Sequence, residues 1–189
     1  MKVTRNLACL IAASTLLCSC ANKNSKSQES AEETSVENVE ENQTFVAEEG
    51  AQYLDITVPS LKAPETIKLS QFVENNKLTL VDCWASWCGP CMAEMPNLVN
   101  IYANYHEAGL EIVGISFDKE REDWQNAVDR LNMTWPQGSE LNGWENQMME
   151  KYGVQSIPCT FLINQQGTIL AIGLRGEELE AKIKETLGL

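Results

Sequence analysis

The stretch that decides the expected fold is LVDCWASWCGPC, residues 80–91. It continues an apolar run over residues 78–84, which is typical of a strand buried on both faces of a sheet. A helix is expected to follow from about Pro90 to Ala108, with a kink at Pro96. The two cysteines of the stretch therefore fall where a buried strand gives way to a helix.

Hydrophobic periodicity outside this stretch predicts alternating strands and helices. Strand, helix and strand in that order imply a right-handed crossover and a parallel core. Extended pieces are expected at 53–58, 67–69 and 110–116, helices near Ser70 and at 122–131, 145–152 and 177–187, and a hairpin at 160–163 and 168–172. The sequence thus predicts an α/β domain with a mixed sheet flanked by helices, an N-terminal strand or hairpin extension, and an inserted helix after the first strand–helix–strand unit.

Cys88 and Cys91 are three residues apart at the expected helix N-terminus and can close a small disulfide ring. Free amide groups and the helix dipole favour an anion there, so the Cys88 thiolate should be more populated than that of a free thiol. Cys91, one turn further along, should be less exposed. The pair can supply an attacking thiolate and a second thiol that resolves a mixed disulfide.

A structural disulfide and half of a zinc site are the alternatives for this pair. A tetrahedral zinc site needs two more ligands, but the sequence has no second closely spaced cysteine pair in the expected domain. His106 is its only histidine. We therefore expect no metal and no cofactor.

The charge balance argues against one class of partner. The 189 residues contain 14 Lys and Arg against 27 Asp and Glu, a net charge of −13. No sustained cationic surface is available to neutralise phosphates, so nucleic acid is not expected as a partner.

The first fifty residues are expected to lie outside the fold. Lys2, Arg5 and the apolar run 7–17 form an export signal over residues 1–19, too short to span a bilayer comfortably. The residues before Cys20 resemble a bacterial lipobox, which implies lipidation of Cys20. Residues 20–50 are acidic and poor in large apolar side chains, and are expected to form a flexible, lipid-anchored linker before a domain at 51–189.

Three segments in the right order carry a resemblance to a known family. Residues 80–91 resemble the active-site segment of thioredoxins, residues 91–96 (CMAEMP) resemble the exported, membrane-tethered TlpA/ResA branch, and Ser156-Ile157-Pro158 resembles the family's cis-proline loop. The resemblance covers about residues 53–189 and implies a thioredoxin fold.

The resemblance implies roles for the residues in these segments. Cys88 would be the nucleophile and Cys91 the resolving thiol. Asp82 matches a buried acid that exchanges a proton with the inner cysteine, and Glu94 matches an acid that the TlpA/ResA branch uses near the same thiol. The sequence alone also favours Asp82, because a carboxylate in an apolar strand tends to have a raised pKa.

Substrate contacts follow from the same resemblance. Trp87, Gly89 and Pro90 would border the cysteine pair and contact the substrate. A cis bond before Pro158 would place the Ile157 backbone beside the pair, where an extended substrate segment can hydrogen-bond as an added strand.

Two cysteines depart from the family pattern. Cys83 replaces a usual aromatic and is expected to be buried and inert. Cys159 follows the expected cis-proline, so an alternative disulfide or a redox-tuning role stays open beside a structural one. A third group needs no special role: Trp124, Trp135, Trp144, Met148 and Met149 are expected to pack, although Trp135-Pro136 could help to shape a substrate groove.

The sequence therefore predicts an envelope-facing thiol-disulfide oxidoreductase, lipid-anchored through Cys20. The Gly89-Pro90 dipeptide favours a reductase of disulfides in envelope proteins, such as apocytochrome c or other periplasmic thiols. As in its relatives, a membrane protein would donate electrons. The alternatives are a redoxin-type thiol peroxidase, whose P-x-x-x-T-x-x-C pattern is missing, and a copper-binding chaperone that uses Cys88 and Cys91.

Overall fold

A central sheet of five strands, ordered β5-β4-β3-β6-β7, organises the chain in a computed structural model that describes residues 47–62 and 65–189. β3 (Leu78–Trp84), β4 (Leu110–Ser116) and β5 (Gln137–Gly138) run parallel. β6 (Cys159–Asn164) and β7 (Ile169–Ile172) form a hairpin that pairs antiparallel with β3. The predicted mixed sheet is therefore confirmed.

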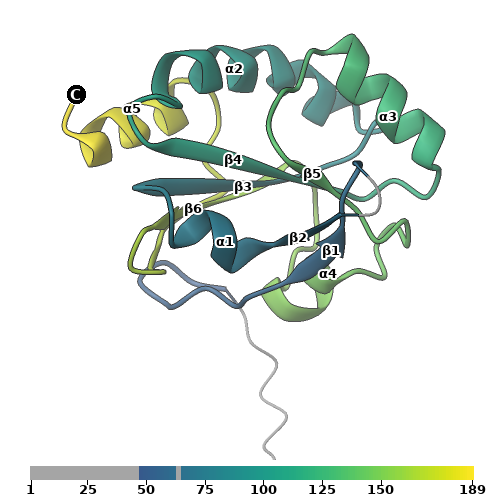
Figure 1. Cartoon of the computed structure of the whole chain (residues 1–189), viewed down its shortest axis with the longest axis horizontal. Coiled ribbons are helices and arrows are strands. Elements are labelled where there is room, and N and C mark those ends of the chain that lie inside the picture. Colours follow the sequence, from purple (N-terminus) through teal and green to yellow (C-terminus); the bar gives the residue numbers. More distant parts are fainter. Residues whose placement is uncertain (1–46, 63–64) are drawn as a thin grey trace, which may run out of the picture. The chain divides into compact units, whose positions relative to one another are not determined.

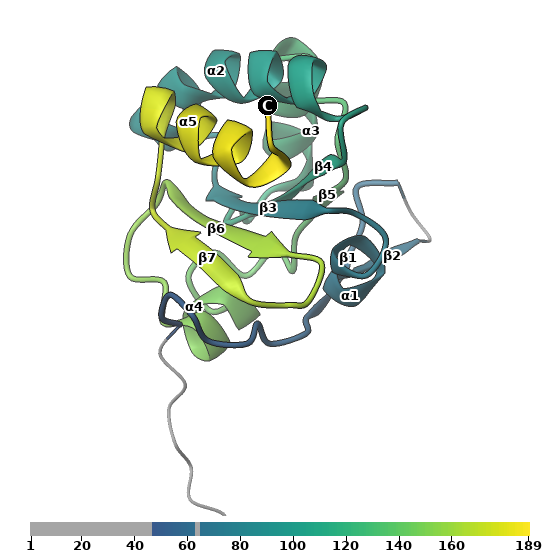
Figure 2. The ribbon, with the colours of Figure 1, turned by 90° about the vertical axis from the view of Figure 1, so that its left-hand side faces the viewer.

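Helices cover both faces of this sheet (Figure 1). α2 (Gly89–Tyr105), α3 (Arg121–Arg130) and α5 (Gly176–Leu187) lie on one face, and α1 (Leu69–Val73) and α4 (Gln147–Tyr152) lie on the other. Figure 2 shows the same layers after a quarter turn, with α5 beside α2. The N-terminal hairpin of β1 (Thr57–Pro59) and β2 (Thr66–Lys68) lies beside α1, as the predicted extension.

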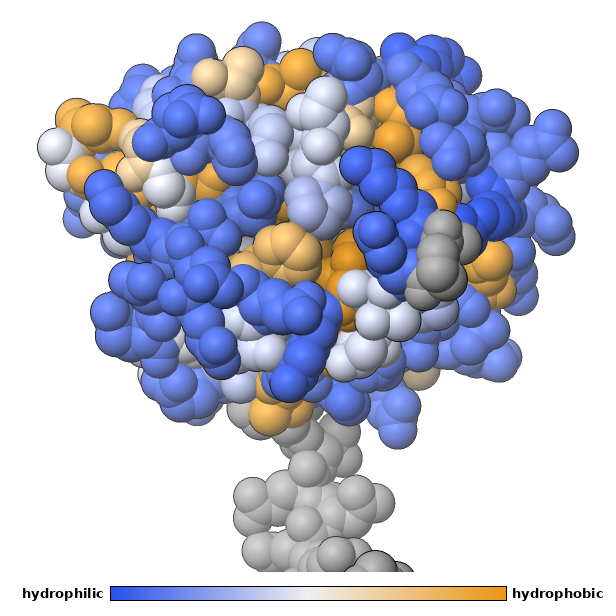
Figure 3. All heavy atoms as spheres, viewed as in Figure 1, coloured by the Kyte–Doolittle hydropathy of each residue, from blue (hydrophilic) through white to orange (hydrophobic). Residues whose placement is uncertain are grey.

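The two long central strands are buried along their whole length. All seven residues of β3 and all seven of β4 are buried, as their nearly continuous apolar sequences predict. Asp82 is the one ionisable carboxyl group within β3, and it lies deep in this core. The outer surface is different in character: the face in Figure 3 is largely hydrophilic, with apolar side chains exposed in patches.

Helix boundaries differ from the prediction by a few residues, for local reasons. α2 ends at Tyr105 instead of Ala108, and the turn up to Gly109, with a φ of 112°, leads into β4. α4 begins at Gln147 because the Asn146 side chain accepts a hydrogen bond from the backbone N–H of Met149 at 3.0 Å.

β5 is a strand that the sequence does not predict. This strand has only two residues, which pair with Gly114 and Ile115 of β4. Two residues cannot show a period-2 pattern, so nothing in the local sequence distinguishes them from a loop.

The described chain contacts the sheet before the predicted domain start at Ala51. The backbone N–H of Gly50 donates to the carbonyl of Ile169 at 2.8 Å, and Ala47 packs against the core, so residues 47–50 are not a free linker. The predicted export signal, Cys20 and the rest of the linker, residues 1–46, lie outside the described residues. Among the helices that are described, none has the length and apolarity needed to cross a membrane.

Candidate active site

Cys88 and Cys91 form a disulfide at the start of α2, directly after the loop that follows β3. The S–S distance is 2.07 Å and the two Cα atoms are 5.2 Å apart. Cys88 retains 6% of its surface exposed, whereas Cys91 is completely buried. Of the two sulfurs, Cys88 is therefore the one that a partner molecule reaches.

The local structure around Cys88 suits a thiolate. Cys88 is the N-cap of α2, and its Sγ accepts a hydrogen bond from the backbone N–H of Cys91 at 3.3 Å. Pro90 occupies the first turn, where a missing N–H costs nothing and a fixed φ favours the helix. The amide and the positive end of the helix dipole would stabilise a negative charge on Cys88 after reduction.

A segment far along the chain completes the surroundings of Cys88. The Ile157-Pro158 peptide bond is cis, as predicted, and the Ile157 carbonyl oxygen lies 3.7 Å from the Cys88 Sγ. Both residues are half-buried, so part of this loop remains open beside the disulfide. The structure thus brings together the cysteine pair and the cis-proline loop, although Cys91 and Pro158 are 67 positions apart in the sequence.

Asp82 lies within β3 and is 1% exposed. Burial, followed by the nearby charge of Glu94, raises the pKa of Asp82 from 3.8 to about 7. Its Oδ2 atom has no hydrogen-bond partner among the described residues. A carboxyl group with a pKa near neutral can both accept and release a proton under ordinary conditions.

Glu94 connects the active-site helix to the C-terminal helix. Its Oε1 accepts hydrogen bonds from the Asn97 side chain and from the backbone N–H of Gly176, both at 2.8 Å. Gly176 is the first residue of α5, so Glu94 satisfies one of the free N–H groups at that helix end. The contact of Glu94 with α5 is not predicted by the sequence, where only an acid near the thiols is expected.

A shallow groove of about 220 Å³ lies beside Trp87, the residue before the disulfide. Trp87 is 57% exposed and Trp144 is 37% exposed, and both line the groove with Phe117. Phe117 and Trp144 meet edge to face, with ring centroids 5.1 Å apart. Glu120 and Asp123 supply acidic groups to its lining.

Comparisons with known proteins agree with this geometry. The sequence model of a family described as thioredoxin-like matches residues 75–169, which include β3, the disulfide and the cis-proline loop. The chain belongs to the thioredoxin-like family.

Relatives within the thioredoxin-like family indicate the TlpA/ResA branch. The chain is 34% identical over 104 residues to the thiol-disulfide oxidoreductase ResA of Oceanobacillus iheyensis, covering 55% of this chain and 52% of that protein. It is 29% identical over 133 residues to ResA of Halalkalibacterium halodurans, covering 69% of this chain and 71% of that protein. The chain thus spans from about half to about seven-tenths of these relatives' length.

Solved structures of the thioredoxin-like family show the same fold. The thioredoxin domain of a thiol-disulfide oxidoreductase from Bacteroides vulgatus is similar with a TM-score of 0.69 and 28% identity, covering 75% of this chain and 99% of that one. A thiol-disulfide oxidoreductase from Bacteroides fragilis gives a TM-score of 0.66 and 28% identity, covering 71% and 98%.

Sequence reasoning missed Asp118, which fixes the loop that carries Trp87. Asp118 is 1% exposed and follows the end of β4. Its carboxylate accepts hydrogen bonds from the backbone N–H of Ser86 at 3.0 Å, the Ser86 hydroxyl at 2.6 Å and the Ser116 hydroxyl at 2.7 Å. An acid two residues after a buried parallel strand is a usable signal, because side chains at that edge meet the active-site loop of the neighbouring strand.

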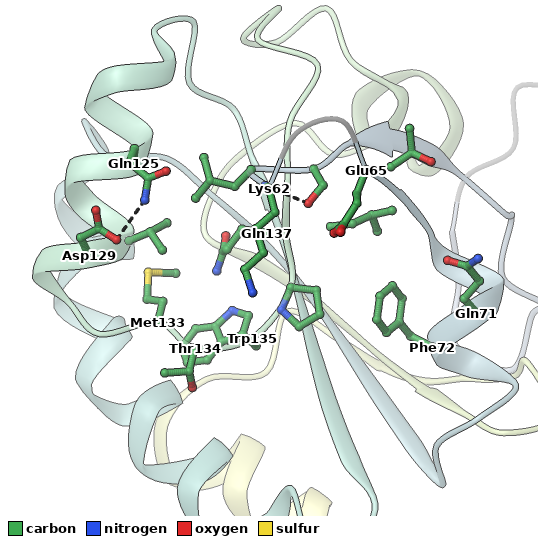
Figure 4. Close-up of a pocket in the computed structure, with 16 residues that line it drawn as sticks. Lys62, Glu65, Gln71, Phe72, Gln125, Asp129, Met133, Thr134, Trp135 and Gln137 are labelled. Carbon is green, nitrogen blue, oxygen red and sulfur yellow. Dashed lines mark hydrogen bonds between the residues drawn. The ribbon is translucent and has the colours of Figure 1, made fainter.

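A larger cavity of about 640 Å³ has neither Cys88 nor Cys91 in its lining. Figure 4 shows its lining residues. Phe72 of α1, Gln137 of β5, and Met133 and Trp135 of the segment between α3 and β5 line it, with residues of β2 and α3. None of the predicted site residues lines this cavity. Trp135 and Pro136 therefore shape a cavity separate from the groove beside Trp87.

Two expectations about packing need correction. Trp124, Trp135 and Met148 are buried as expected, but Trp144 and Met149 are among the exposed large apolar side chains. Trp144 lies in the segment before α4 and lines the groove, which leaves part of its ring open to solvent. Cys83 is fully buried, as predicted, and Cys159 is half-buried; neither forms a disulfide.

Proposed function

We propose that this chain is a thiol-disulfide oxidoreductase that cycles Cys88 and Cys91 between dithiol and disulfide. One observation carries the proposal: a disulfide whose outer sulfur caps a helix N-terminus and faces the carbonyl before a cis-proline. The names of the ResA relatives support the same class of reaction.

The proposed cycle begins with the reduced pair. The Cys88 thiolate attacks a substrate disulfide, forms a mixed disulfide and releases one substrate thiolate. Cys91 then attacks the Cys88 sulfur, closes the Cys88–Cys91 bond and releases the second substrate thiolate. Two electrons pass to the substrate, and its two released thiolates take up one proton that leaves Cys91 and one proton from solvent.

Asp82 and Glu94 are proposed to manage the proton of the buried thiol. Cys91 has no exposed surface, so its proton cannot leave directly to bulk water. Asp82, with a pKa of about 7, could accept that proton, and the Glu94 charge helps to keep this pKa high. We therefore assign catalytic roles to Cys88, Cys91 and Asp82 and a tuning role to Glu94.

The substrate is proposed to contact the rim of the disulfide. Trp87, Gly89 and Pro90 are exposed on one side, and the half-buried Ile157 and Pro158 lie on the other. An extended segment that runs between these two sides would place its own disulfide at the Cys88 sulfur, with backbone hydrogen bonds to the Ile157 loop.

We infer the direction and location from the sequence. The Gly89-Pro90 dipeptide favours a reductase, and the first twenty residues favour export and lipidation at Cys20. The proposed enzyme reduces disulfides in proteins of the cell envelope, such as apocytochrome c. A membrane electron donor then reduces its Cys88–Cys91 disulfide again. No nucleic acid takes part.

A redox titration tests the proposed activity. The full chain is equilibrated in graded thiol–disulfide buffers, and its thiols are trapped and mapped by mass spectrometry. A reductase predicts a two-electron Cys88–Cys91 couple near the thioredoxin value of roughly −270 mV, whereas roughly −120 mV would indicate an oxidant. Absence of any Cys88–Cys91 couple would refute the oxidoreductase.

The lipid anchor has its own test. Wild-type chain and the Cys20→Ala variant are expressed in a bacterial host and fractionated. The wild type should be found in the membrane fraction with a diacylated Cys20, and the variant should not. Unmodified Cys20 in membrane-bound wild type would contradict the anchor without affecting the proposed chemistry.

A further inference from the structure

Two cysteines that the proposed cycle does not use lie directly opposite each other in the sheet. Cys83 of β3 pairs with Cys159 of β6 in the antiparallel register, and neither forms a disulfide. Residues directly opposite on antiparallel strands point to the same face of a sheet. The charge of Cys159 is close enough to raise the pKa of Cys83, which agrees with this proximity.

The type of strand pair sets the distance between the two cysteines. The backbone N–H of Gln165 donates to the carbonyl of Lys77 at 3.2 Å, one position beyond the Leu78–Asn164 pair. Hydrogen-bonded pairs recur at every second position of an antiparallel ladder, so Cys83 and Cys159 form such a pair, with Cα atoms about 5.5 Å apart. This Cα distance lies within the range found for disulfides, about 4.4–6.8 Å.

The same geometry makes a bond between them easy to reduce. Opposite residues keep their Cβ atoms about 4.5–5.5 Å apart, with the larger values in hydrogen-bonded pairs. Disulfides prefer a Cβ separation of about 3.8 Å, and departures from this value make the bond more reducible. A Cys83–Cys159 bond would therefore be labile.

We propose that Cys83 and Cys159 form a second, reversible dithiol–disulfide couple, separate from Cys88–Cys91. A low-molecular-weight disulfide such as oxidised glutathione is the oxidant. Half-buried Cys159 attacks it and releases one glutathione; Cys83 then attacks the Cys159 sulfur and releases the second. Two protein thiols are oxidised, and the reagent disulfide is reduced to two thiols.

The two couples lie on opposite faces of the sheet. The charge of Glu94 on α2 contributes to the raised pKa of Asp82. The next residue, Cys83, instead interacts electrostatically with Tyr152 on α4. α2 and α4 cover different faces (Figure 2). Successive side chains of a strand alternate between faces, so the second couple points away from the helix that carries Cys88 and Cys91.

Oxidation of the second couple should be slow near neutral pH. Burial and the Asp82 charge raise the pKa of Cys159 to about 11, against a smaller opposing effect of Arg175. Burial raises the pKa of Cys83 well above that of a free thiol, with Cys159 and Asp82 adding to the shift. Few thiolates are present at pH 7, so equilibration calls for long incubation at about pH 8.5.

The test uses the full chain with Cys88→Ser and Cys91→Ser, so that Cys83 is the only cysteine in the tryptic peptide of residues 78–119. Cys159 lies in the peptide of residues 152–175, and the three N-terminal cysteines lie in residues 6–23. After incubation with oxidised glutathione, remaining thiols are alkylated in denaturant before digestion. The expected product is peptide 78–119 linked to 152–175, lighter by two hydrogens than their sum and separated by dithiothreitol.

Matched variants decide the interpretation. Adding Cys83→Ala to the same background should abolish the linked product and leave Cys159 as a glutathione adduct. Cys88→Ala with Cys91→Ala should reproduce the link if serine disturbs the fold. Two results in the Cys88→Ser, Cys91→Ser chain would overturn the proposal. One is alkylation of both Cys83 and Cys159 at every thiol–disulfide ratio, and the other is Cys159 found only as a glutathione adduct. The Cys88–Cys91 couple of the wild type is measured separately, so either result stands without the other.

The relative potential gives a second readout. Titration with increasing reduced glutathione should break the Cys83–Cys159 link at a lower thiol-to-disulfide ratio than the Cys88–Cys91 bond of the wild type. A link that survives more strongly reducing buffers than Cys88–Cys91 would mean an unstrained structural disulfide and would contradict the labile couple.

Discussion

At the scale of single residues, the ionisation of Asp82 links stability to pH. Its folded pKa of about 7 exceeds the unfolded value of 3.8, so the stability present at low pH is lost as pH rises from about 4 to about 7. The asparagine of the Asp82→Asn variant cannot ionise, so this variant does not lose that stability as the pH rises from about 4 to about 7. The measured quantity is the free energy of unfolding of the oxidised variant minus that of oxidised wild type. We expect this difference to be larger at pH 8 than at pH 4 by up to about 4 kcal/mol.

Urea unfolding at the two pH values measures this gain. Asp123→Asn removes an exposed acid and serves as the control, for which we expect a nearly constant difference from wild type. If Asp82→Asn differs from wild type equally at pH 4 and pH 8, Asp82 does not ionise in the folded protein over this range.

The same substitution tests the proton role of Asp82 in turnover. Asp82→Asn should reduce disulfide between pH 6 and 9 more slowly, with a flatter pH profile, because no carboxylate remains to accept the Cys91 proton. The measurement is reduction of a protein disulfide at saturating electron donor. Rates and pH dependence equal to those of wild type would remove Asp82 from the mechanism.

Two substitutions of Glu94 distinguish the effect of its charge from the effect of its hydrogen bonds. Glu94→Gln keeps an oxygen for the Gly176 N–H but removes the charge, so the inflection near pH 7 should move to lower pH. Glu94→Ala also loses the contact with α5 and should cost about 1–2 kcal/mol of stability. An unmoved inflection in Glu94→Gln would show that the Glu94 charge does not act on Asp82.

At the scale of elements, Asp118 joins the end of β4 to the loop between β3 and α2. Asp118→Ala removes the acceptor of three hydrogen bonds and leaves the buried Ser116 hydroxyl without it. We expect a loss of about 2–3 kcal/mol in the free energy of unfolding, measured by urea titration. Asp123→Ala removes a nearby exposed acid and should change stability by less than about 0.5 kcal/mol. Equal effects of the two variants would mean that Asp118 does not anchor the loop.

The elements also show what the sequence can and cannot reveal. The apolar runs of β3 and β4 and the position of Pro90 predict the central strands and the start of α2, because burial and helix capping leave local patterns. β5 has two residues and no pattern. The partners of Asp118 depend on the pairing of Trp84 with Ser116, a register that brings together residues 32 positions apart. Such long-range contacts follow from the assembled sheet and not from either segment alone.

At the scale of the whole molecule, three separate parts of the chain form the groove beside the disulfide. Trp87 comes from the loop before α2, Phe117 directly follows β4, and Trp144 lies in the segment before α4. Phe117 is buried, but Trp87 and Trp144 are exposed, and exposed aromatic rings beside a reactive group are typical anchors for a protein partner. Their position suits the residues that flank a substrate disulfide, whereas a minimal disulfide such as 2-hydroxyethyl disulfide has no flanking residues to contact the groove.

Trp144→Ala should therefore distinguish protein substrates from small ones. We expect the KM for a protein disulfide to rise about tenfold, corresponding to about 1.4 kcal/mol of lost contact, with kcat nearly unchanged. Reduction of 2-hydroxyethyl disulfide, which carries no flanking residues, should be unaffected. Met149→Ala removes a side chain that is 42% exposed but does not line the groove, and it should change neither reaction. A parallel loss for both substrates in Trp144→Ala would point to damage at the disulfide itself, and no loss for either would exclude the groove from substrate binding.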